Sequence, residues 1–209
     1  MEKQEIRTFG RRHGKKLSAR KERLVQNVLP QIMPNESETN DILEIGFGAG
    51  EHVRELAQEY PNKIIIGAEP FVNGVATLLS AICDDNNEIR PEYKNIRIWP
   101  DDVRLIMNQS KFKFSEIWVL HPDPWPKARH EKRRLLSAEF LNLLGANLEP
   151  GGKIIIGTDH WEYFDWIGEQ VKNTNLGICD SQIETIQTRY QKKNMAHTDV
   201  TKYMILTNN

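Results

Sequence analysis

Residues 41–51 read Asp-Ile-Leu-Glu-Ile-Gly-Phe-Gly-Ala-Gly-Glu, a short apolar run that ends in three alternating glycines, Gly46, Gly48 and Gly50. The run predicts a buried strand, and a helical pattern opens at Glu51 directly behind the glycines. Glycine lets the backbone turn sharply and approach a ligand closely, because it has no Cβ. The stretch therefore predicts a strand, a glycine loop and a helix, which either bind a ligand or form a tight turn alone.

The spacing of the glycines separates the ligand classes that such loops bind. A dinucleotide loop would need its third glycine at position 51, which is Glu51, and no lysine follows at the spacing of a phosphate-binding P-loop. An acidic residue, Glu44, instead precedes the glycines. This arrangement resembles the S-adenosylmethionine loop of Rossmann-like methyltransferases. There an acidic lining suits a ligand whose amino group and sulfonium are both cationic.

The rest of the chain alternates short apolar runs with segments of helical spacing. The apolar runs are rich in β-branched residues and nearly free of charge, as expected of parallel strands that are covered on both faces. They lie at 42–45, 64–67, 96–98, 117–120 and 154–156, with helical segments at 51–60, 72–84, 103–109 and 135–147. This alternation predicts a doubly wound, mostly parallel α/β sheet.

The two ends of the chain complete this pattern. Ser18 is suited to cap a helix over about 18–28, and prolines and polar residues then lead into the first strand. After the fifth strand the pattern predicts a helix near 161–172 and further strands near 183–187 and at 203–207, which makes a seven-stranded sheet. We therefore expect a basic N-terminal arm and helix over 1–34 and a single Rossmann-like domain over 35–209.

Acidic side chains are expected at the same edge of this sheet. Glu69 follows the second strand, where a carboxylate can accept hydrogen bonds from both hydroxyls of a ribose. Asp101 follows the third strand and is placed to accept a hydrogen bond from an adenine amino group. The adjoining Asp102 ranks second for this contact because it is also suited to cap the next helix. Together with Glu44, these residues favour a nucleoside site over a bare turn.

Length and composition narrow the class of protein. The 209 residues suit one domain, and 39% hydrophobic with 27% charged residues is a globular composition. No run approaches the roughly 20 apolar residues of a membrane span. The basic N-terminus has no apolar stretch behind it, and the chain has only two cysteines. These features favour a cytoplasmic protein with no disulfide framework and no metal site.

The formal net charge of −1 conceals a strong separation of charge. Residues 7–23 carry eight Lys and Arg against one acid, and residues 127–134 carry five against one. Residues 188–197 carry three Lys and Arg and no acid. Such segments are either solvated faces or the binding surface for a polyanion, and the charge pattern by itself does not decide between them.

The loop after the fourth strand, His121-Pro122-Asp123-Pro124-Trp125-Pro126-Lys127, lies where a methyl acceptor would sit. Its three prolines restrict the backbone and hold the side chains between them. Trp125 can stack on a base, Asp123 can accept from a ring N–H or offset a positive charge, and Lys127 can bind a phosphate. The alternative is a stiff loop in which Trp125 only packs against the core.

Residues 122–134, Pro-Asp-Pro-Trp-Pro-Lys-Ala-Arg-His-Glu-Lys-Arg-Arg, resemble the signature of the bacterial TrmB family, the tRNA (guanine-N7)-methyltransferases. The likeness extends over nearly the whole chain. Residues 7–12 resemble the family's basic arm and residues 43–48 its cofactor loop, and Thr158-Asp159 and Thr188-Arg189-Tyr190-Gln191 also fit. The family usually ends the last of these segments with Glu, whereas Gln191 keeps the hydrogen-bonding shape and loses the charge.

The resemblance implies transfer of the methyl group of S-adenosyl-L-methionine, which becomes S-adenosyl-L-homocysteine, to N7 of the variable-loop guanosine of tRNA. It implies a monomer or homodimer, without choosing between them. The implied catalytic residue is Asp123, and the implied cofactor site comprises Glu44, Gly46, Gly48, Gly50, Glu69, Asp101, Asp102 and Asp123. The implied substrate contacts are Lys127, Asp159, Thr188, Arg189, Tyr190 and Gln191.

Two other interpretations account for part of the sequence. A methyltransferase of the same fold that acts on a small molecule would leave the basic arm unexplained. An RNA-binding scaffold without chemistry would have no need of acids at Glu44, Glu69 and Asp101. Five histidines show no metal spacing, and we expect each at the surface or behind the residues that touch a ligand: His13, His52, His130, His160 and His197. Cys179 is expected in a loop, and neither cysteine is assigned a role.

Overall fold

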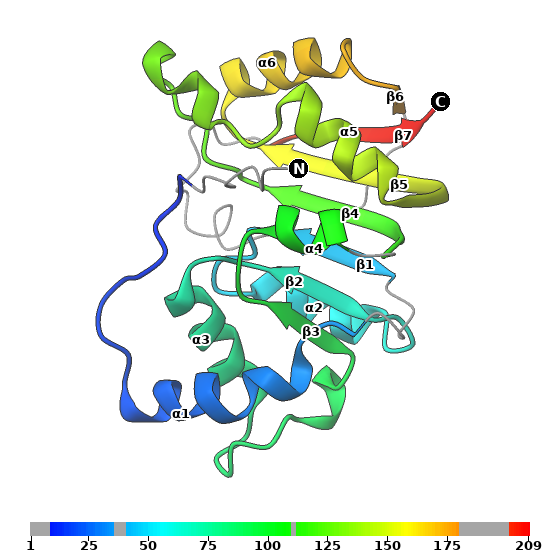
Figure 1. The fold of residues 1–209 in the computed structure, drawn as a ribbon. Coiled ribbons are helices and arrows are strands. Elements are labelled where there is room, and N and C mark those ends of the chain that lie inside the picture. The colour runs from blue at the N-terminus through cyan, green and yellow to red at the C-terminus, as the bar shows by residue number, and fades with distance from the viewer. Residues whose placement is uncertain (1–8, 36–40, 110–111, 180–200) are drawn as a thin grey trace.

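The computed structural model of the chain describes residues 9–35, 41–109, 112–179 and 201–209. Within these ranges, seven strands form one sheet in the order β3-β2-β1-β4-β5-β7-β6, which runs through the middle of the molecule (Figure 1). The strands are β1 (Ile42–Ile45), β2 (Ile65–Ala68), β3 (Ile96–Trp99), β4 (Phe114–Leu120), β5 (Leu148–Thr158), β6 (Leu176–Cys179) and β7 (Lys202–Asn208). The strand order reverses between β1 and β4, and ligands of doubly wound sheets bind at such a point.

The pairing of the strands confirms the predicted fold class. β1 pairs in parallel with β2 and β4, β2 with β3, and β4 with β5, whereas β7 runs antiparallel to β5 and β6. Every residue of β1 and of β2 is buried, because helices cover both faces of the sheet. The apolar runs of the sequence are therefore the centre of a Rossmann-like, mostly parallel, seven-stranded sheet.

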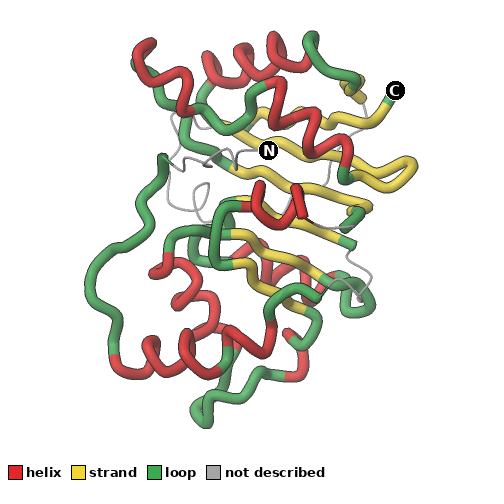
Figure 2. Tube along the Cα trace, in the orientation of Figure 1, coloured by secondary structure: helices red, strands yellow, loops and turns green. Residues whose placement is uncertain are grey.

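Helices lie on both sides of the sheet (Figure 2). They are α1 (Ala19–Asn27), α2 (Glu51–Glu59), α3 (Val72–Ile82), α4 (Val103–Gln109), α5 (Ala138–Ala146) and α6 (Trp161–Val171), with 3₁₀ turns η1 (Leu29–Ile32), η2 (Pro91–Tyr93) and η3 (Ala128–Arg133). None of the helices in the described ranges has both the length and the apolarity that crossing a bilayer requires.

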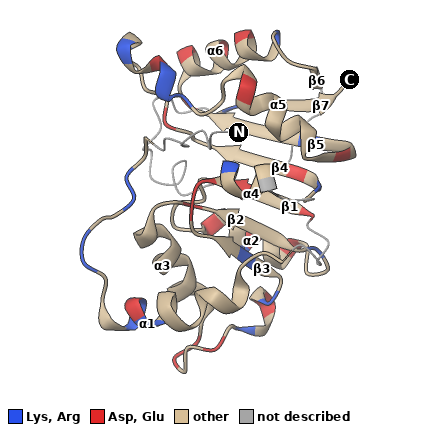
Figure 3. Cartoon of the chain, viewed as in Figure 1, with Lys and Arg blue, Asp and Glu red and all other residues tan. Residues whose placement is uncertain are grey.

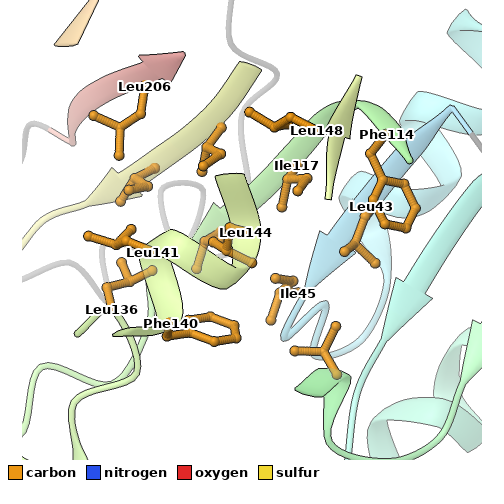
Figure 4. Packing of buried hydrophobic residues seen from close by; sticks show 14 of the residues in the cluster. Leu43, Ile45, Phe114, Ile117, Leu136, Phe140, Leu141, Leu144, Leu148 and Leu206 are labelled. Carbon is orange, nitrogen blue, oxygen red and sulfur yellow. The ribbon is translucent and has the colours of Figure 1, made fainter. Parts of the chain in front are cut away.

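Two hydrophobic cores lie on opposite faces of the sheet. Side chains of α1, α2 and α3 pack on one face, where Ile42 of β1 lies. Side chains of α4, α5 and α6 pack on the other, where the next residue, Leu43, lies. Figure 4 shows Leu141 and Leu144 of α5 in this second core. Because successive side chains of a strand point to opposite faces, adjacent residues of one short strand stabilise two different layers.

The first helix is packed firmly onto the fold. The side chain of Ser18 accepts a hydrogen bond from the Lys21 N–H, so Ser18 is the N-cap of α1 as predicted. α1 lies beside α3 (Figure 1), and Arg20 donates to Ser80 Oγ at 2.7 Å. Leu24 is fully buried in the core that α1, α2 and α3 share. The arm that precedes α1 is therefore held in place at its C-terminal end.

The C-terminal part of the sheet differs from the prediction. The strand that follows α6 is β6, so Cys179 lies in a strand and not in a loop. The predicted strand at 183–187 lies outside the described residues. In β6, Leu176 is buried and Ile178 is 57% exposed, with a glycine between them. The apolar residues of this strand therefore do not mark one buried face, and the strand gives only a weak signal in the sequence.

The start of β5 also differs from the prediction. The sequence predicts this strand at 154–156, but β5 begins earlier, at Leu148, and includes Pro150-Gly151-Gly152. The pairing with β4 shifts register between Phe114 and Glu116, and Gly151 takes a φ of +78°. The proline and glycines thus form a bulge within the strand rather than a boundary.

Candidate active site

The glycine loop leaves β1 through three residues in the left-handed region. Gly46, Gly48 and Gly50 have φ values of +74°, +59° and +78°. A Cβ on Gly46 or Gly48 would meet nothing within 4 Å, whereas one on Gly50 would meet Leu78 of α3 at 2.7 Å. The first two glycines therefore face open space at the carboxyl end of β1, and the third allows α2 to pack against α3.

Glu69 ties this loop to the start of α3. Its Oε2 accepts a hydrogen bond from the Gly48 N–H at 2.9 Å, and its Oε1 accepts one from the Phe71 N–H at 2.9 Å. Burial raises the pKa of Glu69 although both hydrogen bonds favour the charged form, and Asp123 and Glu44 add repulsion. The carboxylates of Glu44 in β1, Glu69 after β2 and Asp123 after β4 thus lie close enough to influence one another.

Glu44 is paired in the protein interior with His52 of α2. Oε2 of Glu44 lies 3.1 Å from Nδ1 of His52, and the two side chains are 5% and 3% exposed. Burial opposes a charge on the imidazole, but Glu44, Glu55 and Glu59 outweigh it and raise the pKa of His52. His52 therefore lies directly behind a residue that was predicted to bind the cofactor.

The two aspartates that follow β3 have different partners. Asp102 is buried, and its carboxylate accepts hydrogen bonds from Arg104 Nε at 2.8 Å, Nη2 at 2.6 Å and the backbone N–H at 3.0 Å. The Asp102 carboxylate therefore bonds to the first turn of α4, which is the helix-capping role that the sequence offered as its alternative. Asp101 has the more exposed carboxylate, and its Oδ1 accepts a hydrogen bond from Arg12 Nη2 of the arm at 2.7 Å. The geometry favours Asp101 over Asp102 for a ligand contact.

The arm crosses the carboxyl edge of the sheet before it reaches α1. Phe9 lies 5.6 Å from the guanidinium of Arg133, in η3 after β4. Further on, the carbonyl of Arg12 accepts a hydrogen bond from the Val72 N–H at the start of α3. Figure 3 shows Lys and Arg along the arm and η3. The arm thus spans the edge from β4 to α3 and carries cations along it.

The loop after β4 has an unusual backbone. His121 and Trp125 have φ values of +47° and +43°, which residues other than glycine rarely adopt. Each such residue costs on the order of 1–3 kcal/mol and persists only where the surrounding structure imposes it. Asp123 lies between them with an exposed side chain. The loop therefore presents Asp123 at the sheet edge on a backbone that is held in place.

Arg134 anchors this loop from behind. Its Nε donates a hydrogen bond to the carbonyl of Pro124 at 2.9 Å, and its side chain is 8% exposed. Its guanidinium lies 5.4 Å from the ring centroid of Tyr163 and 4.9 Å from that of Trp166, both on α6. Burial raises the pKa of Tyr163 to about 12, so its ring stays neutral beneath the cation. Arg134 thereby joins the loop to α6.

The predicted base-stacking residue, Trp125, is half-buried. The guanidinium of Arg133 lies over its ring at 5.0 Å, and His130 meets it edge-on at 5.6 Å. One face of the indole is thus packed against protein, which leaves at most one face for a base. Lys127 is exposed at the start of η3, where its ammonium can reach a phosphate.

Asp159 follows β5 and lies beside the loop after β4. Its Oδ1 is 3.7 Å from Nδ1 of His121. Burial lowers the pKa of His121, and Asp159 only partly opposes this decrease, so His121 is mainly neutral near pH 7. The remaining predicted substrate contacts, Thr188, Arg189, Tyr190 and Gln191, lie outside the described residues.

These residues fit S-adenosylmethionine. Carboxylates at Glu44 and Asp123 suit its cationic amino and sulfonium groups, and Glu69 retains lone pairs for ribose hydroxyls. Gly46 and Gly48 leave open space beside the loop for a closely bound ligand. Within the described ranges, no group of three or more His, Cys, Asp or Glu side chains could hold a metal ion.

The sheet order and the acid-lined glycine loop define a Rossmann-like, S-adenosylmethionine-dependent methyltransferase. Solved structures of methyltransferases share this fold. The 16S rRNA methyltransferase KamB is similar with a TM-score of 0.56 and 14% identity, over 93% of this chain and 94% of that one. A methyltransferase from Pyrococcus furiosus has a TM-score of 0.54 and 14% identity, over 88% and 81% of the two chains. At such identities the likeness shows the fold alone.

Sequence comparison shows the particular family. Residues 38–208 match the family model described as "Putative methyltransferase". A tRNA (guanine-N(7)-)-methyltransferase of Neorickettsia sennetsu is 35% identical, over 91% of this chain and 86% of that protein. One from Novosphingobium aromaticivorans is 42% identical, over 75% and 71% of the two chains. The chain belongs to the tRNA (guanine-N7)-methyltransferase family, which confirms the resemblance seen in the sequence.

Three residues that organise the site were not singled out by the sequence. Arg12 was one of many cations in the arm, and Arg134 one of several in a basic motif. The only signal for His52 is its place in the first turn of the helix behind the glycine loop, eight residues after Glu44. Each acts through a contact with a residue distant in sequence or hidden in the core, which composition and spacing do not reveal.

Proposed function

We propose that this protein transfers the methyl group of S-adenosylmethionine to N7 of the variable-loop guanosine of tRNA, in the cytoplasm. Membership of the family and the activity named for its curated relatives support the reaction. The observation that carries the proposal is the set of acids at or just after the carboxyl ends of five adjacent strands, Glu44, Glu69, Asp101, Asp123 and Asp159, bordered by a basic arm. An acid-lined centre suits a cationic cofactor, and its basic border suits a polyanionic substrate.

The chemistry asks the protein for positioning rather than for a base. S-adenosylmethionine supplies a methyl group that is activated by a sulfonium. N7 of guanine has a lone pair and no proton, so no residue has to deprotonate it. Holding N7 in line with the methyl carbon can contribute up to roughly 7–11 kcal/mol. The stiff loop that carries Asp123 is suited to this task, because its backbone is held by prolines and by Arg134.

Methylation places a positive charge on the purine, and a nearby carboxylate stabilises that charge as it develops. Asp123 is exposed at the sheet edge and is therefore our candidate catalytic residue. Asp159 lies beside the same loop, through its contact with His121, and is a candidate substrate contact. Neither residue needs to gain or lose a proton in this scheme.

The basic segments have a matching role in binding tRNA. N7 lies in a deep groove of A-form RNA or in tertiary pairing, so the guanine has to leave its stack to react. Residues 1–34 and the η3 segment would hold phosphates on either side of the extruded base, with Lys127 nearest to the loop. By resemblance, Thr188, Arg189, Tyr190 and Gln191 would complete the substrate contacts.

The test is methyl transfer from labelled S-adenosylmethionine to an unmodified tRNA transcript, followed by digestion and identification of the nucleosides. We expect N7-methylguanosine from the variable loop, and none from a transcript in which that guanosine is replaced by adenosine. Label at another nucleoside, or equal label in both transcripts, would contradict the proposed substrate. Cofactor binding without any RNA product would favour a small-molecule acceptor.

A further inference from the structure

The side chain of His52 occupies a position that the proposed reaction does not use. It is buried on the first turn of α2, and among the described residues only its Nδ1 has a hydrogen-bonding partner, Glu44. Its Nε2 is buried and has no hydrogen-bond partner among the described residues. The indole of Trp118 meets the ring at 4.8 Å and 62°, an edge-on contact that fixes the imidazole plane. A polar side chain in such a place needs an explanation.

We propose that His52 is a positioning residue that holds Glu44 for the cationic amino group of the cofactor and releases a proton when the cofactor binds. This inference rests on the proposed function, specifically on Glu44 as a cofactor contact. Nδ1–H of His52 binds one carboxylate oxygen, Oε2, at 3.1 Å. The other oxygen is left free to accept a hydrogen bond from the cofactor.

The charges around His52 account for the proton. Glu44 of β1 and Glu55 and Glu59 of α2 face the imidazole and favour its charged form, while Trp118 of β4 is neutral. The charged form is nevertheless poorly accommodated, because the Nε2–H of an imidazolium would have nothing to donate to. Only the surrounding negative charge retains the proton.

A cation that approaches Glu44 offsets this negative charge. The imidazolium then faces a second positive charge across one carboxylate, and its proton passes to the solvent. Neutral His52 keeps the hydrogen bond to Glu44, whose full negative charge now faces the cofactor. Cofactor affinity should therefore fall as the pH falls through the titration of His52, because protons compete with the cofactor.

Isothermal titration calorimetry tests this coupling with S-adenosylmethionine and S-adenosylhomocysteine as probes, in buffers of different ionisation enthalpy. The matched variant is His52→Asn, whose amide N–H can replace Nδ1–H but does not titrate. We expect proton release from the wild type near pH 7, up to about one proton per cofactor. His52→Asn should lack this contribution and bind within about threefold of the wild type at about pH 8.5. Other titrating groups, including Glu69 and the ligand amino group, are common to both proteins.

A second variant and a spectroscopic measurement separate positioning from packing. His52→Leu removes the hydrogen bond, so we expect about tenfold weaker binding than His52→Asn at every pH, equivalent to about 1.4 kcal/mol. The imidazole resonances of His52 should titrate at higher pH without cofactor than with it. Equal proton release from wild type and His52→Asn, or an unchanged titration of His52, would overturn the inference while leaving the proposed function intact. No binding of either probe would instead overturn both.

Discussion

At the scale of single residues, the site depends on carboxylates whose surroundings differ. Asp123 is exposed on a rigid loop, Glu69 is buried and bonded to two backbone N–H groups, and Glu44 is paired with a histidine. The same chemical group thus contacts solvent, the glycine loop and the core. We expect their substitutions to have different effects, and the pH dependence of stability to report on the buried pair.

Replacing Asp123 by alanine should reduce turnover far more than it reduces tRNA affinity. The carboxylate would stabilise a charge that exists only as the methyl group is transferred, and losing such an interaction typically costs about 10²–10³-fold in kcat. Single-turnover rates at saturating tRNA, together with filter-binding Kd values, give the two quantities. Glu149→Ala, in the bulge of β5, is a matched exposed control. Equal losses of rate and affinity would indicate that Asp123 is structural.

The buried His52–Glu44 pair should make stability depend on pH. Since the pKa of His52 is raised above its ordinary value of 6.5 in the folded state, the folded protein binds more protons than the unfolded chain above that pH. The stabilisation is complete below about pH 6.5 and is lost as the pH rises through the folded-state pKa. Urea unfolding of wild type and His52→Asn from about pH 6 to 9 should show their difference in free energy shrinking with pH. A constant difference would contradict the raised pKa.

At the scale of elements, the loop after β4 and helix α6 act as one unit. Arg134 joins them because it bonds to the carbonyl of Pro124 and lies over two aromatic rings of α6. The strained φ values of His121 and Trp125 persist only where the surrounding structure holds them, and the bond from Arg134 is one such contact. The backbone geometry at Asp123 is therefore imposed by a helix some 40 residues later in the chain.

Replacing Arg134 by methionine should loosen this loop. Methionine keeps the unbranched stem but loses the hydrogen bond and the cation over the rings, which together stabilise by about 1.5–4 kcal/mol. We expect a lower Tm and a kcat reduced by at least about tenfold, with cofactor affinity nearly unchanged. Arg129→Met, at an exposed position of η3, is the control for loss of positive charge. Similar activity losses in both variants would point to tRNA binding instead of loop geometry.

At the scale of the whole molecule, the arm and η3 bring positive charge to the edge where the acids lie (Figure 3). The proposed cofactor site and the proposed surface for tRNA therefore share one border. Arg12 lies on this border. Its guanidinium pairs with Asp101, and its carbonyl accepts a hydrogen bond from the Val72 N–H at the start of α3. Helix α1 is fixed in the core, so the arm can be removed without removing the helix.

Deletion of residues 1–16 should weaken tRNA binding and flatten its dependence on salt. The deletion ends before the Ser18 cap, so α1 should remain folded. Each phosphate contact that is lost should reduce the slope of log K against log salt by about 0.7–0.9. Filter binding at several salt concentrations measures this slope. Substitution of Lys94 and Lys113, which precede β3 and β4 at the opposite edge, should leave it unchanged. An unaltered slope after the deletion would place the tRNA footprint elsewhere.

The sequence by itself determined the layers of this protein and the sheet edge at which the acids of the candidate site gather. Short β-branched runs alternate with helical segments, and this local pattern suffices because each strand must be covered on both faces. The position of Glu44, Glu69, Asp101, Asp123 and Asp159 at or just after the ends of parallel strands follows from the same rule, because parallel strands end at one edge. Only the tertiary structure decided which partner each of these acids has.

Those partners come from distant elements, and no spacing in the chain encodes them. Asp101 pairs with Arg12, which lies 89 residues earlier in the sequence. Trp118 of β4 packs edge-on against His52 in the buried pair of Glu44 and His52. The strand β6 and the bulge in β5 were also decided by packing and register rather than by local preference. Local sequence determines where helices and strands form, because the hydrophobic periodicity of each element extends over only a few neighbouring residues. The charge state and orientation of a side chain depend instead on groups that folding brings beside it.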